Sequence, residues 1–219
     1  PLPLPVGFSQ VHIENGVDTW SLEAMYMYRM HPLGYCKRLQ GELLLGVRYM
    51  QFDERFDLTA TGGSALEPIG ALDSLSWRMR AENHIVGPQV GARLWARNRR
   101  WELSTEGRFF AGFDQQSVRQ RGDVQPLNAW VIDPSQFYHV FHASEFTPGI
   151  EFRAHAKLHL TRGLALRAGY TALWIDNIAR PSDMIDYTWT STSILGIKGS
   201  ANQQDVFMNG LDLGLEWNR

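Results

Sequence analysis

Two pairs of histidines are the side chains of this chain best suited to metal binding. His155 and His159 are four residues apart, and His139 and His142 are three apart. On a β-strand the first two rings would share a face but stand about 13 Å apart, and Lys157 between them would repel a cation. We therefore interpret this pair as polar side chains of one strand face. No third ligand is positioned near the second pair, so we expect neither a metal ion nor a cofactor.

Serine hydrolysis and phosphate binding find little support in the sequence. A hydrolase needs Ser, His and an acid brought together, and no Gly-x-Ser-x-Gly motif occurs. The stretch Gly87-Pro88-Gln-Val-Gly91 is followed by no Lys-Ser/Thr and opens no helix, so it is not a phosphate loop. The net charge of −2 argues against a nucleic-acid binder, which normally carries a basic excess. We expect a protein that is not an enzyme and does not bind nucleic acid.

In several predicted strands apolar and polar residues alternate, so that each strand has an apolar and a polar face. Fourteen charged residues fall on the polar faces of these strands. They are Glu42, Arg48, Arg78, Arg80, Glu82, Arg93, Glu102, Glu106, Arg108, Glu151, Arg153, Lys157, Arg167 and Glu216. Inside a narrow barrel such Arg and Glu side chains would pair and close the interior. Inside a wide barrel they would line an aqueous pore and tune its ion preference. The strands alone leave both alternatives open, because barrel width follows strand number.

The stretch from Glu145 to Leu160 shows most clearly which elements position these charges. Apolar residues such as Phe146, Ile150 and Phe152 alternate there with polar ones over about fifteen residues. Soluble strands usually run about five or six residues. A longer strand with one apolar and one charged face matches a tilted strand that crosses a bilayer.

The same alternation predicts an all-β fold, an antiparallel up-and-down transmembrane β-barrel or a large arc of one. Strands are expected near 20–30, 39–56, 74–97, 101–115, 144–160, 164–176 and 205–218. Val6–Ile13 is a weak eighth candidate, since Pro1, Pro3 and Pro5 before it cannot donate ladder hydrogen bonds. Lipid-facing residues are expected to be Leu43, Leu45, Trp77, Phe109, Ile150, Phe152, Leu158, Leu166, Leu213 and Leu215. The alternation changes parity after Gly87-Pro88, which indicates either a bulge or two separate strands.

The connections between these strands alternate in length. Short links are expected at 31–38, 98–100 and 161–163, and long loops at about 57–73, 116–143 and 176–204. Outer-membrane barrels have short periplasmic turns and longer external loops. We therefore divide the chain into an extended N-terminal segment, residues 1–17, and a barrel domain, residues 18–219.

Aromatic residues gather toward the ends of the predicted strands. They are Trp20, Tyr49, Trp77, Trp101, Phe113, Trp174 and Trp217. Amphipathic rings favour the headgroup level of a bilayer, so this set is interpreted as an interfacial girdle. The alternative is that aromatic residues are simply good strand formers at any position.

Several stretches resemble an outer-membrane β-barrel family that is abundant in planctomycete bacteria. They are Leu44-Leu-Gly-Val-Arg-Tyr-Met-Gln-Phe-Asp53, Glu82-Asn-His-Ile-Val-Gly-Pro-Gln-Val-Gly91, Glu106-Gly-Arg-Phe-Phe-Ala-Gly-Phe113, Arg167-Ala-Gly-Tyr-Thr-Ala-Leu-Trp-Ile-Asp-Asn-Ile-Ala-Arg-Pro181 and Asn209-Gly-Leu-Asp-Leu-Gly-Leu-Glu-Trp217. The resemblance implies a barrel fold and an outer-membrane location, and it implies no known activity. Members are usually longer, so it also implies that these 219 residues are a C-terminal portion.

These observations favour an outer-membrane barrel with a structural or pore role, in contact with outer-membrane lipid. Further barrel strands or a partner chain are expected at the edges near Trp20 and Trp217, because an unpaired edge in a bilayer leaves backbone groups unsatisfied. One alternative is a soluble lipocalin-like barrel that binds a small apolar ligand, with the two faces inverted. Another is a surface receptor or adhesin that acts through its long loops, above all 116–143 with Trp130, Phe137, Tyr138 and Phe141.

Overall fold

The computed structural model describes residues 6–30, 39–65, 72–126, 136–161, 163–190 and 193–217. Pro1, Pro3, Pro5 and Trp130 lie outside this part of the chain. The elements are β1 (Val6–Arg29), β2 (Leu39–Ala65), β3 (Leu72–Arg97), β4 (Trp101–Pro126), β5 (Gln136–His159), β6 (Leu164–Ile178), β7 (Ile185–Thr190), β8 (Ser193–Ile197), the 3-10 turn η1 (Gly199–Ala201) and β9 (Gln204–Trp217). No helix among the described residues is long and apolar enough to cross a membrane.

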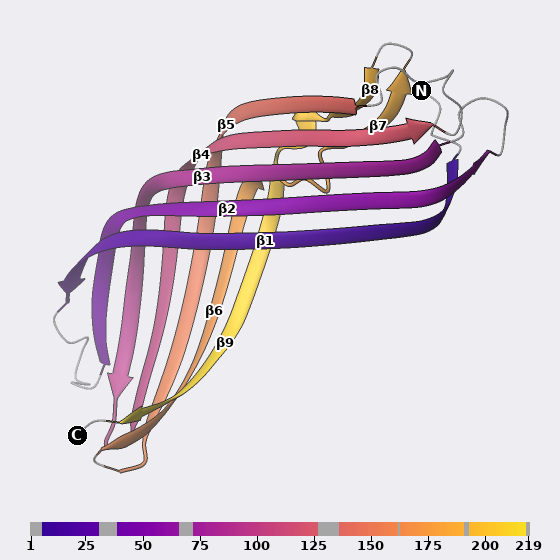
Figure 1. The fold of residues 1–219 in the computed structure, drawn as a ribbon. Coiled ribbons are helices and arrows are strands. Elements are labelled where there is room, and N and C mark those ends of the chain that lie inside the picture. The colour runs from indigo at the N-terminus through magenta and orange to yellow at the C-terminus, as the bar shows by residue number, and fades with distance from the viewer. Residues whose placement is uncertain are drawn as a thin grey trace.

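Seven of these strands form one antiparallel up-and-down sheet in the order β1-β2-β3-β4-β5-β6-β9. The prediction of an all-β, up-and-down barrel or arc is thereby confirmed. Figure 1 shows that β1–β5 run together across the upper part of the view; β1 ends at the left, while β2–β5 turn and continue downward beside β6 and β9. The sheet thus curls into a half-barrel with a concave and a convex face, and β7 and β8 pair apart from it.

The strands are longer than the sequence pattern predicts. β1 is one strand from Val6, so Val6–Ile13 is the first part of the strand that contains Trp20 and is not a separate strand. β2 continues to Ala65, β4 to Pro126, and β5 begins at Gln136. Most of the residues expected in the loops 57–73 and 116–143 are therefore strand. Polar residues alternate with apolar ones there too, and the loop interpretation overlooked this.

The pairing of β3 passes Gly87 and Pro88 without a register shift toward either neighbour, so the predicted bulge is absent and β3 is one strand. The alternation changes parity for another reason: at this level the apolar residues move from one face of the sheet to the other. Below this level, in what we call the turn-side half, the convex face is apolar. Above it, in the loop-side half, the concave face is apolar. The turn-side half comprises 22–29, 39–49, 86–97, 101–113, 146–159, β6 and β9; the loop-side half comprises 6–21, 50–65, 72–85, 114–126 and 136–145.

Glycines lie on the concave face at the level of this exchange, where a side chain would collide with the neighbouring strand. A Cβ on Gly87 would stand 2.0 Å from the carbonyl oxygen of Ala111. A Cβ on Gly149 would stand 2.0 Å from the ring of Phe110. The missing side chains let the curled strands approach each other, and let Phe110 lie flat across the concave face.

Two apolar clusters fill the concave face of the loop-side half and of its border with the turn-side half. The first joins Trp77, Met79 and Val118 to Met184 and Ile185 of the connection between β6 and β9. The second joins Phe52, Ile85 and Phe110 to Ile175 and Ile178 at the end of β6. The β6–β9 connection, residues 179–203, therefore folds inward over the sheet and buries its apolar face.

Candidate functional site

The concave face of the turn-side half gathers most of the charges singled out in the sequence. Ten of the fourteen predicted residues lie there in ion pairs: Glu42, Arg48, Arg93, Glu106, Arg108, Glu151, Arg153, Lys157, Arg167 and Glu216. Glu102 lines a concave-face cavity of about 290 Å³ with Arg93 and Glu106. The concave face of the turn-side half is thus rich in ion-paired charges.

Along the concave face, charges of opposite sign follow one another from strand to strand. Arg29 of β1 lies 3.1 Å from Glu42 of β2, and Glu42 lies 3.4 Å from Arg93 of β3. Arg93 in turn lies 2.5 Å from Glu106 of β4. Opposite charges at neighbouring positions on one sheet face support strand pairing. We call this row, with the pairs described next, the ion-pair ladder.

Other pairs of the ladder join strands that are not neighbours in the sheet. Glu23 of β1 lies 2.5 Å from Arg108 of β4, and Arg48 of β2 lies 2.7 Å from Glu151 of β5. Such contacts require the sheet to curl until distant strands face each other across the concave side. Arg48 and Glu151 are buried, with side-chain exposures of 5% and 3%, and the Arg48 guanidinium also stacks on Phe110 at 5.4 Å.

Sequence reasoning omitted several members of this site. Glu23 and Arg29 belong to β1, where Met25 and Met27 occupy the same face and weaken the alternation. Gln89 donates a hydrogen bond of 3.2 Å to Glu23. The only signal for Glu23 and Arg29 was their shared parity on one strand, so the register of β1 with β2 was needed to find them.

Three predicted interior residues lie on the opposite face. Arg78, Arg80 and Glu82 precede Gly87 on the even positions of β3, which belong to the convex face together with Val86 and Val90. The prediction that these three point inward is wrong. It followed the local rule that apolar residues face outward, whereas in the loop-side half the apolar residues pack inward.

The prediction for Trp77, which was expected to face lipid as part of the aromatic girdle, is wrong for the same reason. Trp77 is 2% exposed, packs edge-on against Phe137 at 5.8 Å, and lies in the first apolar cluster. It faces no lipid, and Phe137, expected on a long loop, is buried beside it. The burial of Trp77 therefore contradicts its place in the predicted girdle.

The other six girdle residues lie on the convex face. Trp20, Tyr49, Phe113 and Trp174 stand toward the loop side, and Trp101 and Trp217 at the turn side. Trp20 and Tyr49 contact each other at 5.1 Å between ring centroids. Between the two groups lie exposed apolar side chains: Leu43, Leu45, Phe109, Ile150, Phe152, Leu166, Leu213 and Leu215. Leu158 is part-exposed on the same face. The convex face of the turn-side half thus offers an apolar belt to its surroundings.

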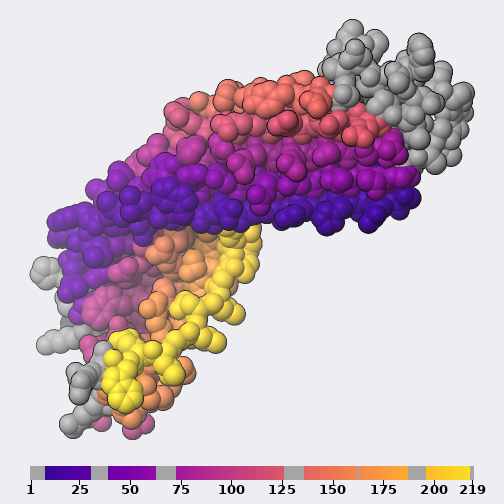
Figure 2. Space-filling view, viewed as in Figure 1, coloured from indigo at the N-terminus to yellow at the C-terminus, as the bar shows by residue number. Residues whose placement is uncertain are grey.

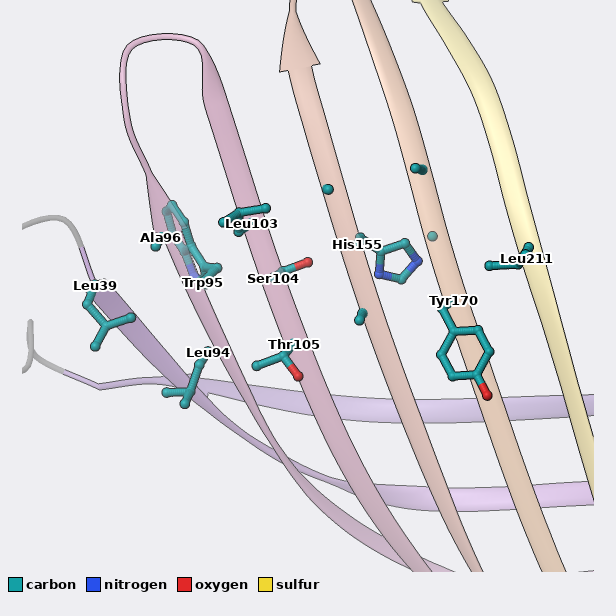
Figure 3. Close-up of a pocket in the computed structure, with 14 residues that line it drawn as sticks. Leu39, Leu94, Trp95, Ala96, Leu103, Ser104, Thr105, His155, Tyr170 and Leu211 are labelled. Carbon is teal, nitrogen blue, oxygen red and sulfur yellow. The ribbon is translucent and has the colours of Figure 1, made fainter.

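A cavity of about 530 Å³ lies within this half, lined by residues of β2 to β6 and of β9 (Figure 3). Its walls include Leu94, Leu103, Tyr170 and Leu211, and small alanines such as Ala156 leave the hollow between them. The lining is mainly apolar and suits contact with an acyl chain. It brings together no acid, base and nucleophile.

The inward connection is attached to the concave face by buried polar contacts. Asn83 of β3 donates to the carbonyl of Ala179 at 3.0 Å and accepts from its N–H at 2.9 Å. Arg180 donates to Glu54, a fully buried carboxylate of β2, at 2.9 Å. This hydrogen bond raises the pKa of the Arg180 guanidinium, which keeps Arg180 charged. Further along, Asn202 donates to Gln116 at 2.8 Å. Both ends of the connection are therefore held on the wall.

The histidines form no metal centre in this arrangement. His155 and His159 share the concave face, while His139 and His142 point to opposite faces of β5. In the part of the chain that the structure describes, no group of three or more His, Cys, Asp and Glu side chains could hold a metal ion.

Asp114 is the most unusual carboxylate in the loop-side half. It is fully buried on the concave face and stands opposite Glu145 of β5. Burial raises the pKa of Asp114 to about 7, and the negative charge of Glu145 adds to this. The group therefore titrates near neutrality.

Replacing Asp114 by Asn should stabilise the protein above pH 7 and have no such effect below about pH 4. The folded pKa lies above the ordinary value of 3.8, so folding favours the protonated form, and the native state loses stability as pH rises between these values. Unfolding midpoints in detergent at pH 4 and pH 8 would measure this. An equal effect of the substitution at both pH values would contradict the shifted pKa.

A family model described as "Putative beta barrel porin-7 (BBP7)" matches residues 7–218. Comparisons with curated proteins and with solved structures found no match.

Proposed function

Because the chain belongs to the beta barrel porin-7 family over residues 7–218, we propose that it forms part of an outer-membrane pore and has no catalytic role. The observation that carries this proposal is the division of the turn-side half into an apolar convex face and a charged concave face. A bilayer requires the first face, and an aqueous path requires the second.

The proposed membrane span is the turn-side half alone. Its strand segments run from 22–29 in β1 to the 15 residues of β6, and all but that of β1 reach the roughly 9–11 residues of a tilted membrane strand. Aromatic residues flank its apolar belt. The loop-side half has a polar convex face and an apolar interior, as in a water-soluble sheet. The longest connection, 179–203, lies at that end, and the two shortest, 98–100 and 160–163, lie at the other, which supports an external position for the loop-side half and a periplasmic one for the short turns.

The ion-pair ladder is the proposed wall of the pore. Its charges are of both signs and mostly paired, so small hydrophilic solutes and ions of either sign fit this wall better than one strongly preferred ion. The inward connection 179–203 is the proposed constriction, because it crosses the concave side on the loop side of the ladder. The lipocalin-like alternative needs an apolar interior throughout, whereas the interior of the turn-side half carries the ladder.

The two outer strands support a larger assembly. In the described part of the chain, β1 and β9 are the sheet edges and do not pair with each other, and Figure 2 shows them along two margins of the molecule. Leu213 on β9 is 82% exposed. Unpaired backbone groups are unfavourable in a bilayer, so we propose that further strands, from the same protein or from a partner chain, complete the barrel.

Conductance across a planar bilayer tests the pore. Purified full-length protein should produce ohmic steps, and Glu54→Gln should increase the step size or its noise, because Arg180 then loses its charged partner. Glu14→Gln, on the exposed part of β1, is the matched control and should leave the steps unchanged. A protein that inserts fully without conducting would overturn the pore and leave only a structural role.

The membrane span is tested by charge substitution. Phe152→Arg should reduce the stability of the bilayer-inserted protein by about 2–4 kcal/mol, since Phe152 lies midway along the apolar belt of β5. His142→Arg, on the same face of β5 in the loop-side half, should change it by less than about 0.5 kcal/mol. Urea unfolding from lipid vesicles measures both, and equal effects would contradict the proposed boundary.

A further inference from the structure

Five arginines cluster on the convex face of the loop-side half. Arg55, Arg80 and Arg119 form one row across β2, β3 and β4, because Arg80 is the register partner of both other residues. In the next row Arg78 is the partner of Asp57 on one side and of Arg121 on the other. Together with Tyr138, these side chains line a hollow of about 390 Å³. We call this group the arginine grid.

The grid is poorly neutralised by its own carboxylates. Asp57 lies 3.9 Å from both Arg55 and Arg78, and Glu82 lies 3.6 Å from Arg119. Arg80 and Arg121 are exposed and form no ion pair within the described residues. Asp123 lines an adjoining hollow with Arg78 and Arg121, so five guanidinium groups face three carboxylates. The ion-pair contacts that exist are long and solvated.

Like charges that stand directly opposite on neighbouring strands destabilise a sheet. The grid contains three such pairs: Arg55 with Arg80, Arg80 with Arg119, and Arg78 with Arg121. An anion that bridges the guanidinium groups would offset the repulsion within these pairs. Planar guanidinium groups bind phosphate through paired hydrogen bonds, and several of them on one sheet face suit a group that carries more than one phosphate.

The position of the grid relative to the apolar belt narrows the choice of partner. Arg80 is six residues from Val86, and Arg119 is six from Phe113, both at the upper limit of the belt on the same face. Six residues span about 20 Å of strand, which a tilt of 35–45° reduces to about 15 Å of height. The headgroup layer of an ordinary phospholipid bilayer is only about 5–8 Å thick on each side. A phospholipid phosphate therefore lies too low, whereas a sugar headgroup reaches this height.

We propose that the arginine grid binds the phosphorylated sugar headgroup of a glycolipid in the outer leaflet of the membrane. The inference rests on the proposed membrane span, which places the apolar belt against the acyl chains of the same lipid. The glycolipid would then contact one continuous convex surface, with its chains on the belt and its phosphates on the grid.

Binding to lipid nanodiscs of defined composition tests this proposal. Full-length protein in phosphatidylcholine discs is titrated with a rough lipopolysaccharide whose core sugars carry phosphates, and with the same lipid after dephosphorylation. We expect Arg80→Gln/Arg119→Gln to weaken binding of the phosphorylated form at least about tenfold, because charge-assisted hydrogen bonds to phosphate contribute strongly to the binding free energy. Arg99→Gln/Arg100→Gln removes the same charge at the turn side and should leave binding unchanged.

Two further measurements keep the outcome unambiguous. Without glycolipid, Arg80→Gln should raise the unfolding midpoint, since it removes two of the three opposed pairs; a lower midpoint would indicate a structural role and overturn the proposal. Equal binding of the dephosphorylated lipid, or equal affinity for soluble tripolyphosphate, would overturn the glycolipid assignment. If the protein inserts and conducts but binds the glycolipid equally well with and without its phosphates, the proposal for the arginine grid fails and the proposed pore is unaffected.

Discussion

Replacing Glu151 by Gln should destabilise the bilayer-inserted protein by about 3–5 kcal/mol. The substitution leaves the Arg48 guanidinium buried on the concave face without its charged partner, and an unpaired buried charge is strongly unfavourable. Arg48 Nε already lacks a hydrogen-bond partner, so few other polar contacts would compensate the guanidinium for the loss of Glu151. Urea unfolding from lipid vesicles, followed by the electrophoretic shift between folded and unfolded forms, measures the loss.

Two controls separate the ion pair from general effects of the concave face. Glu102→Gln removes a carboxylate from the same face and should cost less than about 1 kcal/mol, since Glu102 is part-exposed and makes no ion pair among the described residues. The double change Arg48→Met/Glu151→Leu should recover most of the stability, because both buried charges are then absent. An equal loss of stability in Glu151→Gln and Glu102→Gln would mean that Arg48 is hydrated, and would contradict the burial of the Arg48–Glu151 pair.

Trp77→Ala should cost about 3–5 kcal/mol, as expected for a large side chain removed from a packed core. Trp77 contacts Phe137 and stands among the residues that receive Met184 and Ile185 of the inward connection. The loss should also loosen the connection, so protease cleavage within 179–203 should become faster. Unfolding in vesicles and limited proteolysis check the two effects together.

Trp101→Ala is the matched control for this substitution. Trp101 lies half-exposed on the convex face at the turn side, in the position of a girdle residue. Its removal should cost clearly less in the vesicle assay and should not alter cleavage of the connection. A similar cost for both tryptophans, with no change in cleavage, would mean that Trp77 faces lipid after all.

The strands themselves could be predicted because successive side chains of a β-strand point to opposite faces, so apolar and polar residues alternate along the sequence. In β5 the residues Phe146, Ile150 and Phe152 identify the convex side without any knowledge of neighbouring strands. Antiparallel neighbours joined by short links also have little choice of register. The seven-stranded, up-and-down order followed from these two local rules.

Which face is apolar depends on what lies beside it, and that information is not local. Trp77 and Phe109 both occupy apolar positions of long alternating strands, yet one is buried and the other exposed. The difference arises because the connection 179–203 covers the concave face above Gly87, while nothing in the described structure covers the convex face below it. The errors at Trp77, Arg78, Arg80 and Glu82 all come from extending one rule across this boundary.

The sequence alone thus determined the existence of the seven strands of the main sheet, their antiparallel order and the charged face of the turn-side half, since each depends on the two-residue repeat of a strand. The tertiary structure alone decided which charges meet. Glu23 reaches Arg108, and Arg48 reaches Glu151, only because the sheet curls until strands separated by many residues face one another. It also decided where the apolar face turns from outside to inside, because a folded connection some hundred residues away in the chain supplies the partner surface that buries Trp77.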